Sequence, residues 1–147
     1  MRIETILVVC VGNICRSPMA EAMLQRALEG KTTTTVSSAG LGALAGHPAD
    51  EISIELMAER DLDINSHVAR QLTPEMIEES DLILVMEHGH RRAIDSMEPA
   101  ARGKVYRLCE WRNQDIPDPF QQPRKAFEAA LVLIEQGDND WAEKISA

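Results

Sequence analysis

The stretch ILVVCVGNICRSP, residues 6–18, places two cysteines, an arginine and a serine directly after an apolar run. The apolar residues belong to a segment, 2–9, that predicts a β-strand. Downstream, apolar side chains recur at the spacing of one helix face, at Ala20, Met23, Leu24, Ala27 and Leu28. This pattern predicts a helix that ends at Gly30, and Pro18 suits its first turn, where the backbone N–H that proline lacks would have no partner. The polar loop therefore lies between the carboxyl end of a strand and the start of a helix.

Strands and helices alternate along the rest of the chain. β-branched and apolar runs predict strands over 32–38, 81–86 and 104–109. Helices are predicted over 48–62 and 73–80, between residue 86 and a break at 99–103, and around the stripe Phe127, Ala130, Leu131 and Ile134. This alternation predicts an α/β fold in three layers, a parallel sheet with helices on both faces. In such folds ligands bind beyond the carboxyl ends of the strands, where the strand order reverses, so the loop after residue 9 is the predicted site.

Composition restricts the class of protein. The length of 147 residues fits one domain, 1–147, and the content of 44% hydrophobic and 27% charged residues is typical of a folded globular chain. A formal net charge of −9 disfavours nucleic acid and anionic membranes as partners. No apolar run approaches the ~18 residues of a membrane span, and the N-terminus lacks the features of a signal peptide. We therefore expect a cytoplasmic protein without membrane insertion, and the odd number of cysteines does not suggest a disulfide framework.

The spacing of Cys10 and Arg16 suits the capture of an oxyanion. The five residues between them are enough chain to curl around one tetrahedral anion, with backbone N–H groups turned inward and a helix dipole behind them. Arg16 adds a planar fork for two oxygens, and Gly12 is expected to supply the backbone freedom that a tight curl needs. The same donors favour the thiolate form of Cys10, and Ser17 can donate a hydrogen bond to its sulfur. These residues predict a cysteine nucleophile aimed at the phosphorus of a phosphate ester, although a cysteine that ends a buried strand is more often a small hydrophobe.

Attack on phosphorus by a thiolate needs a second group that protonates the leaving oxygen and later activates water. The segment DIPDPF, residues 115–120, follows the last predicted strand and emerges at the same edge of the sheet. Asp118, between two prolines, is the preferred candidate, and Asp115 is its competitor. Phe120 would then be a wall of the site or a core residue. The alternative for Asp118 is a purely local role, because Asp-Pro commonly forms turns.

Three segments together resemble the low molecular weight protein tyrosine phosphatases. They are CVGNICRSP at 10–18, VSSAG at 36–40 and DPF at 118–120, and the resemblance covers essentially the whole chain. It implies a four-stranded parallel sheet and an enzyme that hydrolyses phosphotyrosine through a phosphocysteine intermediate, without a cofactor and without a metal.

The resemblance also implies individual roles: Cys10 as nucleophile, Arg16 as phosphate clamp and Asp118 as general acid. Loop and rim residues would bind the substrate, namely Val11, Gly12, Asn13, Ile14, Cys15, Ser17, Leu44 and Phe120. Asn13, Ser17 and Ser38 would also support the loop by hydrogen bonds. Many family members have a bulky aromatic residue near position 44 and a tyrosine at position 120, where this chain has Leu44 and Phe120. Because both positions shape the mouth of the site, we expect the substrate preference to differ from that of those members.

Within the family, the segments SAGLGALAGHPAD at 38–50 and ARQL at 69–72 resemble a bacterial group. Its members are paired with tyrosine kinases that control the export of capsule and exopolysaccharide. The resemblance therefore implies a phosphotyrosine protein as partner, in particular an autophosphorylated bacterial tyrosine kinase.

Two other functions fit part of the pattern. An arsenate reductase of the same fold would use the same oxyanion loop, but it needs further cysteines to relay a disulfide, and the only cysteine outside the loop is Cys109. A non-catalytic module that binds phosphate or phosphoproteins would need the loop, but it would gain nothing from a thiolate or from Asp118. For Cys15 two roles remain open: packing in the core, or redox protection of Cys10.

The remaining polar and aromatic residues of interest have ordinary interpretations. Glu87, His88 and His90 are expected to form a solvated helix start rather than a metal site, because a single His-x-His cluster without a further site elsewhere in the chain is weak evidence for a metal. Cys109 is expected in the core. Trp111 is expected either to line the cleft or to pack in the core.

Overall fold

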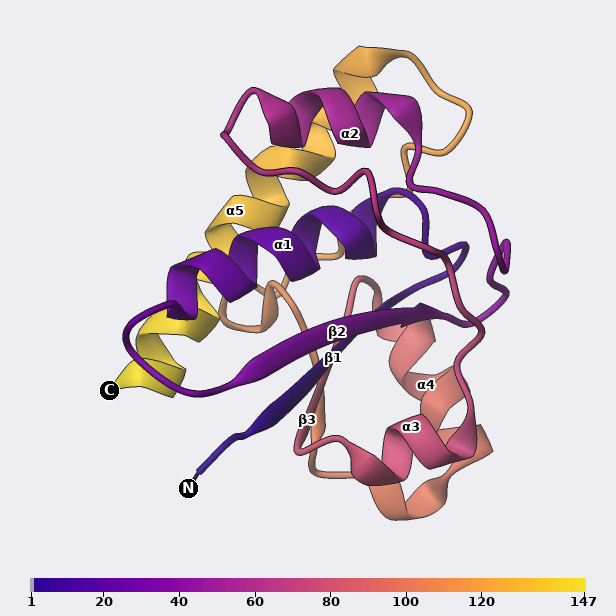
Figure 1. Cartoon of the computed structure of the whole chain (residues 1–147). Helices are drawn as coiled ribbons and strands as arrows, with labels where there is room; N and C mark the ends of the chain where they lie inside the picture. The colour runs from indigo at the N-terminus through magenta and orange to yellow at the C-terminus, as the bar shows by residue number, and fades with distance from the viewer. Residues whose placement is uncertain (1) are drawn as a thin grey trace.

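The computed structural model describes residues 2–147 and confirms the three-layer α/β fold (Figure 1). One parallel sheet has the strand order β2-β1-β3-β4, with β1 Thr5–Cys10, β2 Thr35–Gly40, β3 Leu82–Val85 and β4 Val105–Arg107. The helices are α1 Arg16–Leu28, α2 Glu51–Ala58, α3 Pro74–Glu79, α4 His88–Met97 and α5 Arg124–Ser146, and short 3-10 turns cover Pro99–Ala101 and Glu110–Arg112. Within residues 2–147, no helix combines the length and the apolar character needed to cross a lipid bilayer.

Alternation of side chains along β1 divides the core into two layers, because successive residues of a strand point to opposite faces. Ile6 and Val8 pack in the layer that contains α1, α2 and α5. Leu7 and Val9 pack in the other layer, with residues of α3 and α4. Figure 1 shows the same division, with α1, α2 and α5 on one side of the sheet and α3 and α4 on the other.

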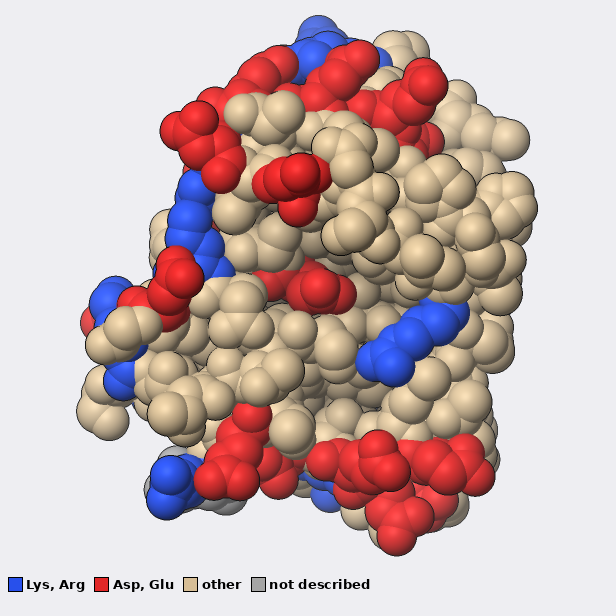
Figure 2. All heavy atoms as spheres, viewed as in Figure 1, with Lys and Arg blue, Asp and Glu red and all other residues tan. Residues whose placement is uncertain are grey.

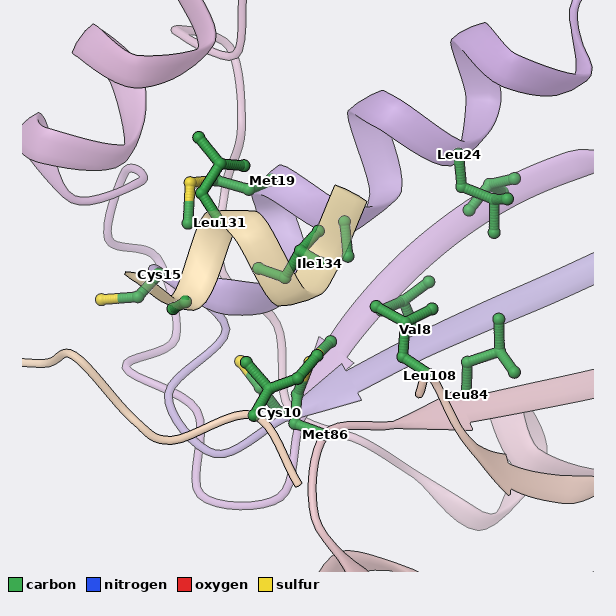
Figure 3. Packing of buried hydrophobic residues seen from close by; sticks show 14 of the residues in the cluster. Val8, Cys10, Cys15, Met19, Leu24, Leu84, Met86, Leu108, Leu131 and Ile134 are labelled. Atoms are coloured by element: carbon green, nitrogen blue, oxygen red, sulfur yellow. The ribbon is translucent and has the colours of Figure 1, made fainter. Parts of the chain in front are cut away.

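The larger layer fixes α1 on the sheet. Met19 of α1 packs beside Leu131 and Ile134 of α5 (Figure 3), and Leu24 belongs to the same buried cluster further along α1. Burial of a side chain of this size contributes about 1.5–3 kcal/mol. The first turns of α1 are therefore held rigidly beside the end of β1.

The predicted strand at 32–38 was wrong at its start, because β2 begins at Thr35. The preceding threonines bond locally instead: the Thr32 hydroxyl oxygen accepts the Thr34 N–H, and the Thr34 hydroxyl donates to the carbonyl of Ile3. Side-chain hydrogen bonds of this kind compete with ladder formation, so β-branched composition alone places the strand too early.

The predicted helix at 48–62 was too long at both ends, because α2 covers only Glu51–Ala58. Asp50 caps its start, since its carboxylate accepts a backbone N–H of the first turn. At the other end the Leu62 N–H donates to the carbonyl of Met57, and Asp61 takes a φ of 59°, which stops the helix.

The strand order reverses at β1, because β2 lies on one side of it and β3 on the other. The carboxyl ends of β1 and β3 therefore border the crevice in which α/β folds bind their ligands. Residues 11–15 leave β1 at this edge, and Glu87 follows β3 at the same edge. The loop singled out by its composition thus occupies the predicted position.

Candidate active site

The loop between β1 and α1 bonds through its carbonyl groups and leaves its amides free. Every carbonyl oxygen from residue 10 to residue 15 accepts a hydrogen bond; the donors, in order, are Leu41 N, Gly42 N, Leu44 N, His67 Nε2, Asp50 N and Ser53 Oγ. None of the amide N–H groups of residues 11–16 donates to an acceptor within residues 2–147. Unpaired N–H groups at the start of a helix form an anion-binding loop.

Asn13 shapes this loop, and the role expected of Gly12 was wrong. Gly12 does not take a positive φ, whereas Asn13 does, at 60°, a conformation that asparagine tolerates better than most residues. The Asn13 side chain donates to Ser17 Oγ at 2.7 Å and to Ser38 Oγ at 3.0 Å. Its oxygen Oδ1 accepts the Arg70 N–H at 2.9 Å. Asn13 therefore joins the loop to α1, to β2 and to the segment before α3.

Cys10 ends β1 with only 2% of its surface exposed. Its Sγ lies 3.0 Å from Ser17 Oγ. Because that oxygen already accepts a hydrogen bond from Asn13, its own proton is free for the sulfur. Gly40, the partner of Cys10 in β2, has no room for a side chain, since a Cβ there would collide with the carbonyl oxygen of Val11. A glycine is therefore required where β2 passes the loop.

The guanidinium of Arg16 is 1% exposed, and within residues 2–147 only its Nη1 donates hydrogen bonds. Nη1 donates to Glu87 Oε2 and to the carbonyl oxygen of Ile116, both at 2.6 Å. Nη2 lies 3.6 Å from Asp118 Oδ2, and Nε has no partner within residues 2–147. The edge formed by Nε and Nη2 can therefore take two oxygens of one anion, which is the two-point contact that favours arginine.

Asp118 both forms a local turn and faces the site, which are the two roles that its sequence suggested. Its Oδ1 accepts the Phe120 N–H at 3.1 Å, as in an Asx turn. Its Oδ2 faces Arg16, and the side chain lines the cavity that contains Cys10. The turn holds the carboxyl group at the mouth of the site.

Asp115, the competitor for the role of general acid, is committed elsewhere. Its Oδ1 accepts hydrogen bonds from Arg107 Nη1 and from the His88 N–H, both at 3.0 Å. Burial acts to raise the pKa of Asp115, but these two hydrogen bonds outweigh it and hold the pKa below its ordinary value. A carboxylate stabilised in this way is a poor proton donor.

A cavity of about 130 Å³ lies over the loop. Its lining includes the three proposed catalytic side chains of Cys10, Arg16 and Asp118. The other lining residues are Val11, Gly12, Ile14, Cys15, Gly42, Leu44 and Phe120. Asn13 and Ser17 do not line it, because both residues are fully buried. Leu44 and Phe120 are 38% and 40% exposed, so they form an apolar rim rather than part of the core.

Cys15 and Cys109 are both buried free cysteines. Burial raises the pKa of Cys15, and the negative charge of Asp50 adds to this effect. Burial likewise raises the pKa of Cys109 to about 11. Cys109 lies in the core, as predicted, where its Sγ donates to the carbonyl oxygen of Leu133.

The interpretation of Glu87 and His90 as a solvated helix start was wrong. Glu87 forms an ion pair with Arg16, and His90 is only 8% exposed, whereas the side chain of His88 is exposed. The position of Glu87 was the missed signal, because it directly follows a buried strand at the ligand-binding edge. Trp111 neither lines the cleft nor enters the core: it is 50% exposed and packs against Trp141.

Comparison with known proteins identifies the family. A family model described as low molecular weight phosphotyrosine protein phosphatase matches residues 5–147. The Ralstonia solanacearum protein named "Probable low molecular weight protein-tyrosine-phosphatase EpsP" is 48% identical over 99% of this chain and 98% of its own. The phosphatase Wzb of Escherichia coli K12 is 45% identical over 98% of this chain and 97% of its own. The solved structure of Vibrio vulnificus Wzb in complex with benzylphosphonate has a TM-score of 0.91 and 44% identity, and covers 97% of this chain and 99% of that one. With its cysteine–arginine loop at the end of β1 and these relatives along its whole length, the chain belongs to the low molecular weight protein tyrosine phosphatases.

Proposed function

We propose that Cys10 is the nucleophile of this tyrosine phosphatase, that Arg16 binds the substrate phosphate and that Asp118 is the general acid and then the general base. The observation that carries the proposal is that all three side chains line one cavity whose floor is a loop with unpaired amides. A phosphate seated there would receive the amide N–H groups and the Nε–Nη2 edge of Arg16, with the sulfur beneath it.

The reaction runs in two balanced steps. In the first, the thiolate of Cys10 attacks phosphorus, the P–O bond to tyrosine breaks, and the proton of Asp118 passes to the phenolate oxygen. In the second, the Asp118 carboxylate takes a proton from water, the water oxygen attacks phosphorus, and the S–P bond breaks to return the thiolate and release phosphate. The Ser17 hydroxyl, 3.0 Å from the sulfur, stabilises the thiolate in its role as nucleophile and as leaving group.

Local charge, rather than the charge of the whole molecule, supports anion binding. The net charge is −9, and in Figure 2 the acidic side chains gather over the ends of the molecule where α2 and α3 lie. The rim of the cavity differs, because residues 41–48 and 119–123 contain no lysine, arginine, aspartate or glutamate. We propose that the substrate residues on either side of the phosphotyrosine contact the apolar side chains of this rim, in particular Leu44 and Phe120 of the enzyme.

The physiological substrate in this proposal is an autophosphorylated bacterial tyrosine kinase that controls polysaccharide export. Support comes from the similarity to EpsP and Wzb along the entire chain. A cytoplasmic location and one catalytic domain over 1–147 belong to the same proposal, because catalysis requires a reduced thiol and a reducing compartment keeps it so.

The rival functions are weakened by particular residues. An arsenate reductase would need a relay cysteine, yet Cys109 lies in the core and its Sγ donates to a backbone carbonyl. A module that only binds phosphate would not need Asp118 at the mouth of the cavity.

The discriminating experiment measures hydrolysis of p-nitrophenyl phosphate and of a phosphotyrosine peptide without added metal, beside arsenate reduction coupled to thioredoxin. Hydrolysis in the wild type, its loss in Cys10→Ser with retained vanadate binding, and no arsenate reduction are expected. Arsenate reduction, or phosphate binding without turnover in the wild type, would overturn the proposal.

A further inference from the structure

The first turn of α4 is built in an unusual way around Glu87. Glu87 is the N-cap residue of α4, but its side chain makes no capping hydrogen bond. The carboxylate instead pairs with Arg16, and the His88 N–H at the start of the helix donates to Asp115 Oδ1. Asp115 therefore accepts one N–H at the helix start, and the Glu87 carboxylate holds the guanidinium instead of capping the helix.

The ring of His90 lies against the same carboxylate oxygen. Its Nε2 is 3.4 Å from Glu87 Oε2, the oxygen that accepts Arg16 Nη1 at 2.6 Å. Only 8% of His90 is exposed, and its Nδ1 is buried without a partner within residues 2–147. Nothing in the two chemical steps uses this histidine, yet it is placed one contact away from the phosphate clamp.

The surroundings favour one protonation state of His90. A proton on Nδ1 would be a buried donor without an acceptor, whereas a proton on Nε2 points to a carboxylate. Burial lowers the pKa of His90, and the positive charge of Arg16 adds to this, while Glu87, Asp115 and Asp118 act in the opposite direction. Burial and the nearby guanidinium therefore favour a neutral ring, and the carboxylate favours its proton on Nε2.

We propose that His90 is a positioning residue of the phosphate clamp: the Nε2–H of its neutral ring steadies Glu87 Oε2, which in turn orients Arg16. This inference rests on the proposed role of Arg16 as the clamp. The 3.4 Å separation is longer than an ordinary N–H···O hydrogen bond. The contact is expected to shorten when phosphate draws the guanidinium into place.

Three variants of His90 separate this role from simple packing. His90→Gln places an amide N–H near the position of Nε2, His90→Asn places it near Nδ1, and His90→Leu offers none. We expect kcat/KM for p-nitrophenyl phosphate to fall about tenfold in His90→Leu and His90→Asn, with weaker inhibition by inorganic phosphate, and to recover largely in His90→Gln. His88→Leu, an exposed neighbour on the same helix turn, is the matched control and should keep wild-type kinetics.

A double-mutant cycle with Glu87→Gln tests whether His90 acts through the carboxylate. If it does, His90→Leu costs little further activity once Glu87 has been neutralised. Independent losses in the cycle, equal losses in His90→Gln and His90→Leu, or an unchanged kcat/KM in His90→Leu would each overturn the inference. Melting temperatures show whether a variant has merely lost stability, and in that case the comparison of His90→Gln with His90→Asn decides. A wild type without phosphatase activity would instead contradict the proposed function itself.

Discussion

Replacing Arg16 by lysine keeps the positive charge at the site but removes its planar fork. In the structure Nη1 is already bonded to Glu87 and to the carbonyl of Ile116, so Nε and Nη2 remain for the substrate. A lysine ammonium satisfies either those two protein acceptors or the phosphate, but not both. The variant therefore loses about two charge-assisted hydrogen bonds to phosphate, each worth about 1.5–3 kcal/mol. The sum of about 3–6 kcal/mol corresponds to a fall in kcat/KM of about 10²–10⁴-fold.

The assay is steady-state hydrolysis of p-nitrophenyl phosphate together with the inhibition constant of vanadate. Both kcat/KM and vanadate affinity should fall, while circular dichroism and the melting temperature show that the fold persists. Arg112→Lys, at an exposed ion pair with Asp140, is the matched control and should behave as wild type. An Arg16→Lys enzyme within about tenfold of wild type would refute the two-point contact deduced from the free edge of the guanidinium.

Three further predictions test other parts of the site and the core. Asp118→Asn keeps the turn but cannot donate an acidic proton, so phosphotyrosine hydrolysis should slow by about 10²–10⁴-fold, more than hydrolysis of aryl esters with better leaving groups; Asp115→Asn is the control, and equal effects of the two variants would exclude Asp118 as the acid. Burial holds Cys15 in its thiol form, so iodoacetate at pH 7 should label Cys10 first, as seen by peptide mass spectrometry, and phosphate should protect it; preferential labelling of Cys15 would contradict this. Asp138 is buried in α5, and neither of its oxygens has a hydrogen-bond partner within residues 2–147; burial raises its pKa well above the ~3.9 of an unfolded chain. The free energy of unfolding should therefore fall as pH rises through the folded pKa of Asp138. In chemical denaturation, Asp138→Ala should be about 1–3 kcal/mol more stable than the wild type at pH 8, with a smaller gain at pH 4. A variant that is less stable than the wild type at pH 8 would show that the carboxylate has a partner.

The order of strands and helices could be predicted because each element carries a strong hydrophobic period. The apolar run of β3 and the helical stripe of α5 both lie in the structure where their patterns place them. Boundaries were harder to predict, since they depend on hydrogen bonds that composition does not encode. The Thr32–Thr34 contacts before β2 and the left-handed turn at Asp61 after α2 are examples.

The site residues that lie close together in the sequence could be predicted from it. Cys10 and Arg16 lie on one loop, so their spacing alone suggested an anion site. Glu87 and His67 reach the same loop from other segments, and their contacts depend on how the sheet is ordered. Only the rule that parallel strands end at one edge could have pointed to Glu87, and no local signal distinguishes His67.

Backbone conformation inside the loop was also beyond local rules. The presence of a glycine favoured Gly12 as the residue with unusual backbone geometry. In the fold Asn13 takes that conformation, because its side chain then reaches Ser17 and Ser38 at once. The hydrogen bonds gained by the side chain outweigh the small cost of the left-handed backbone.

Trapping of the covalent intermediate tests the central claim most directly. The wild-type enzyme would be mixed with a phosphotyrosine peptide, quenched in acid within milliseconds and digested for mass spectrometry. We predict one phosphoryl group on the sulfur of Cys10 in the wild type and no turnover in Cys10→Ser. Rapid hydrolysis without phosphate on Cys10, or turnover by Cys10→Ser, would contradict the assignment of Cys10 as the nucleophile.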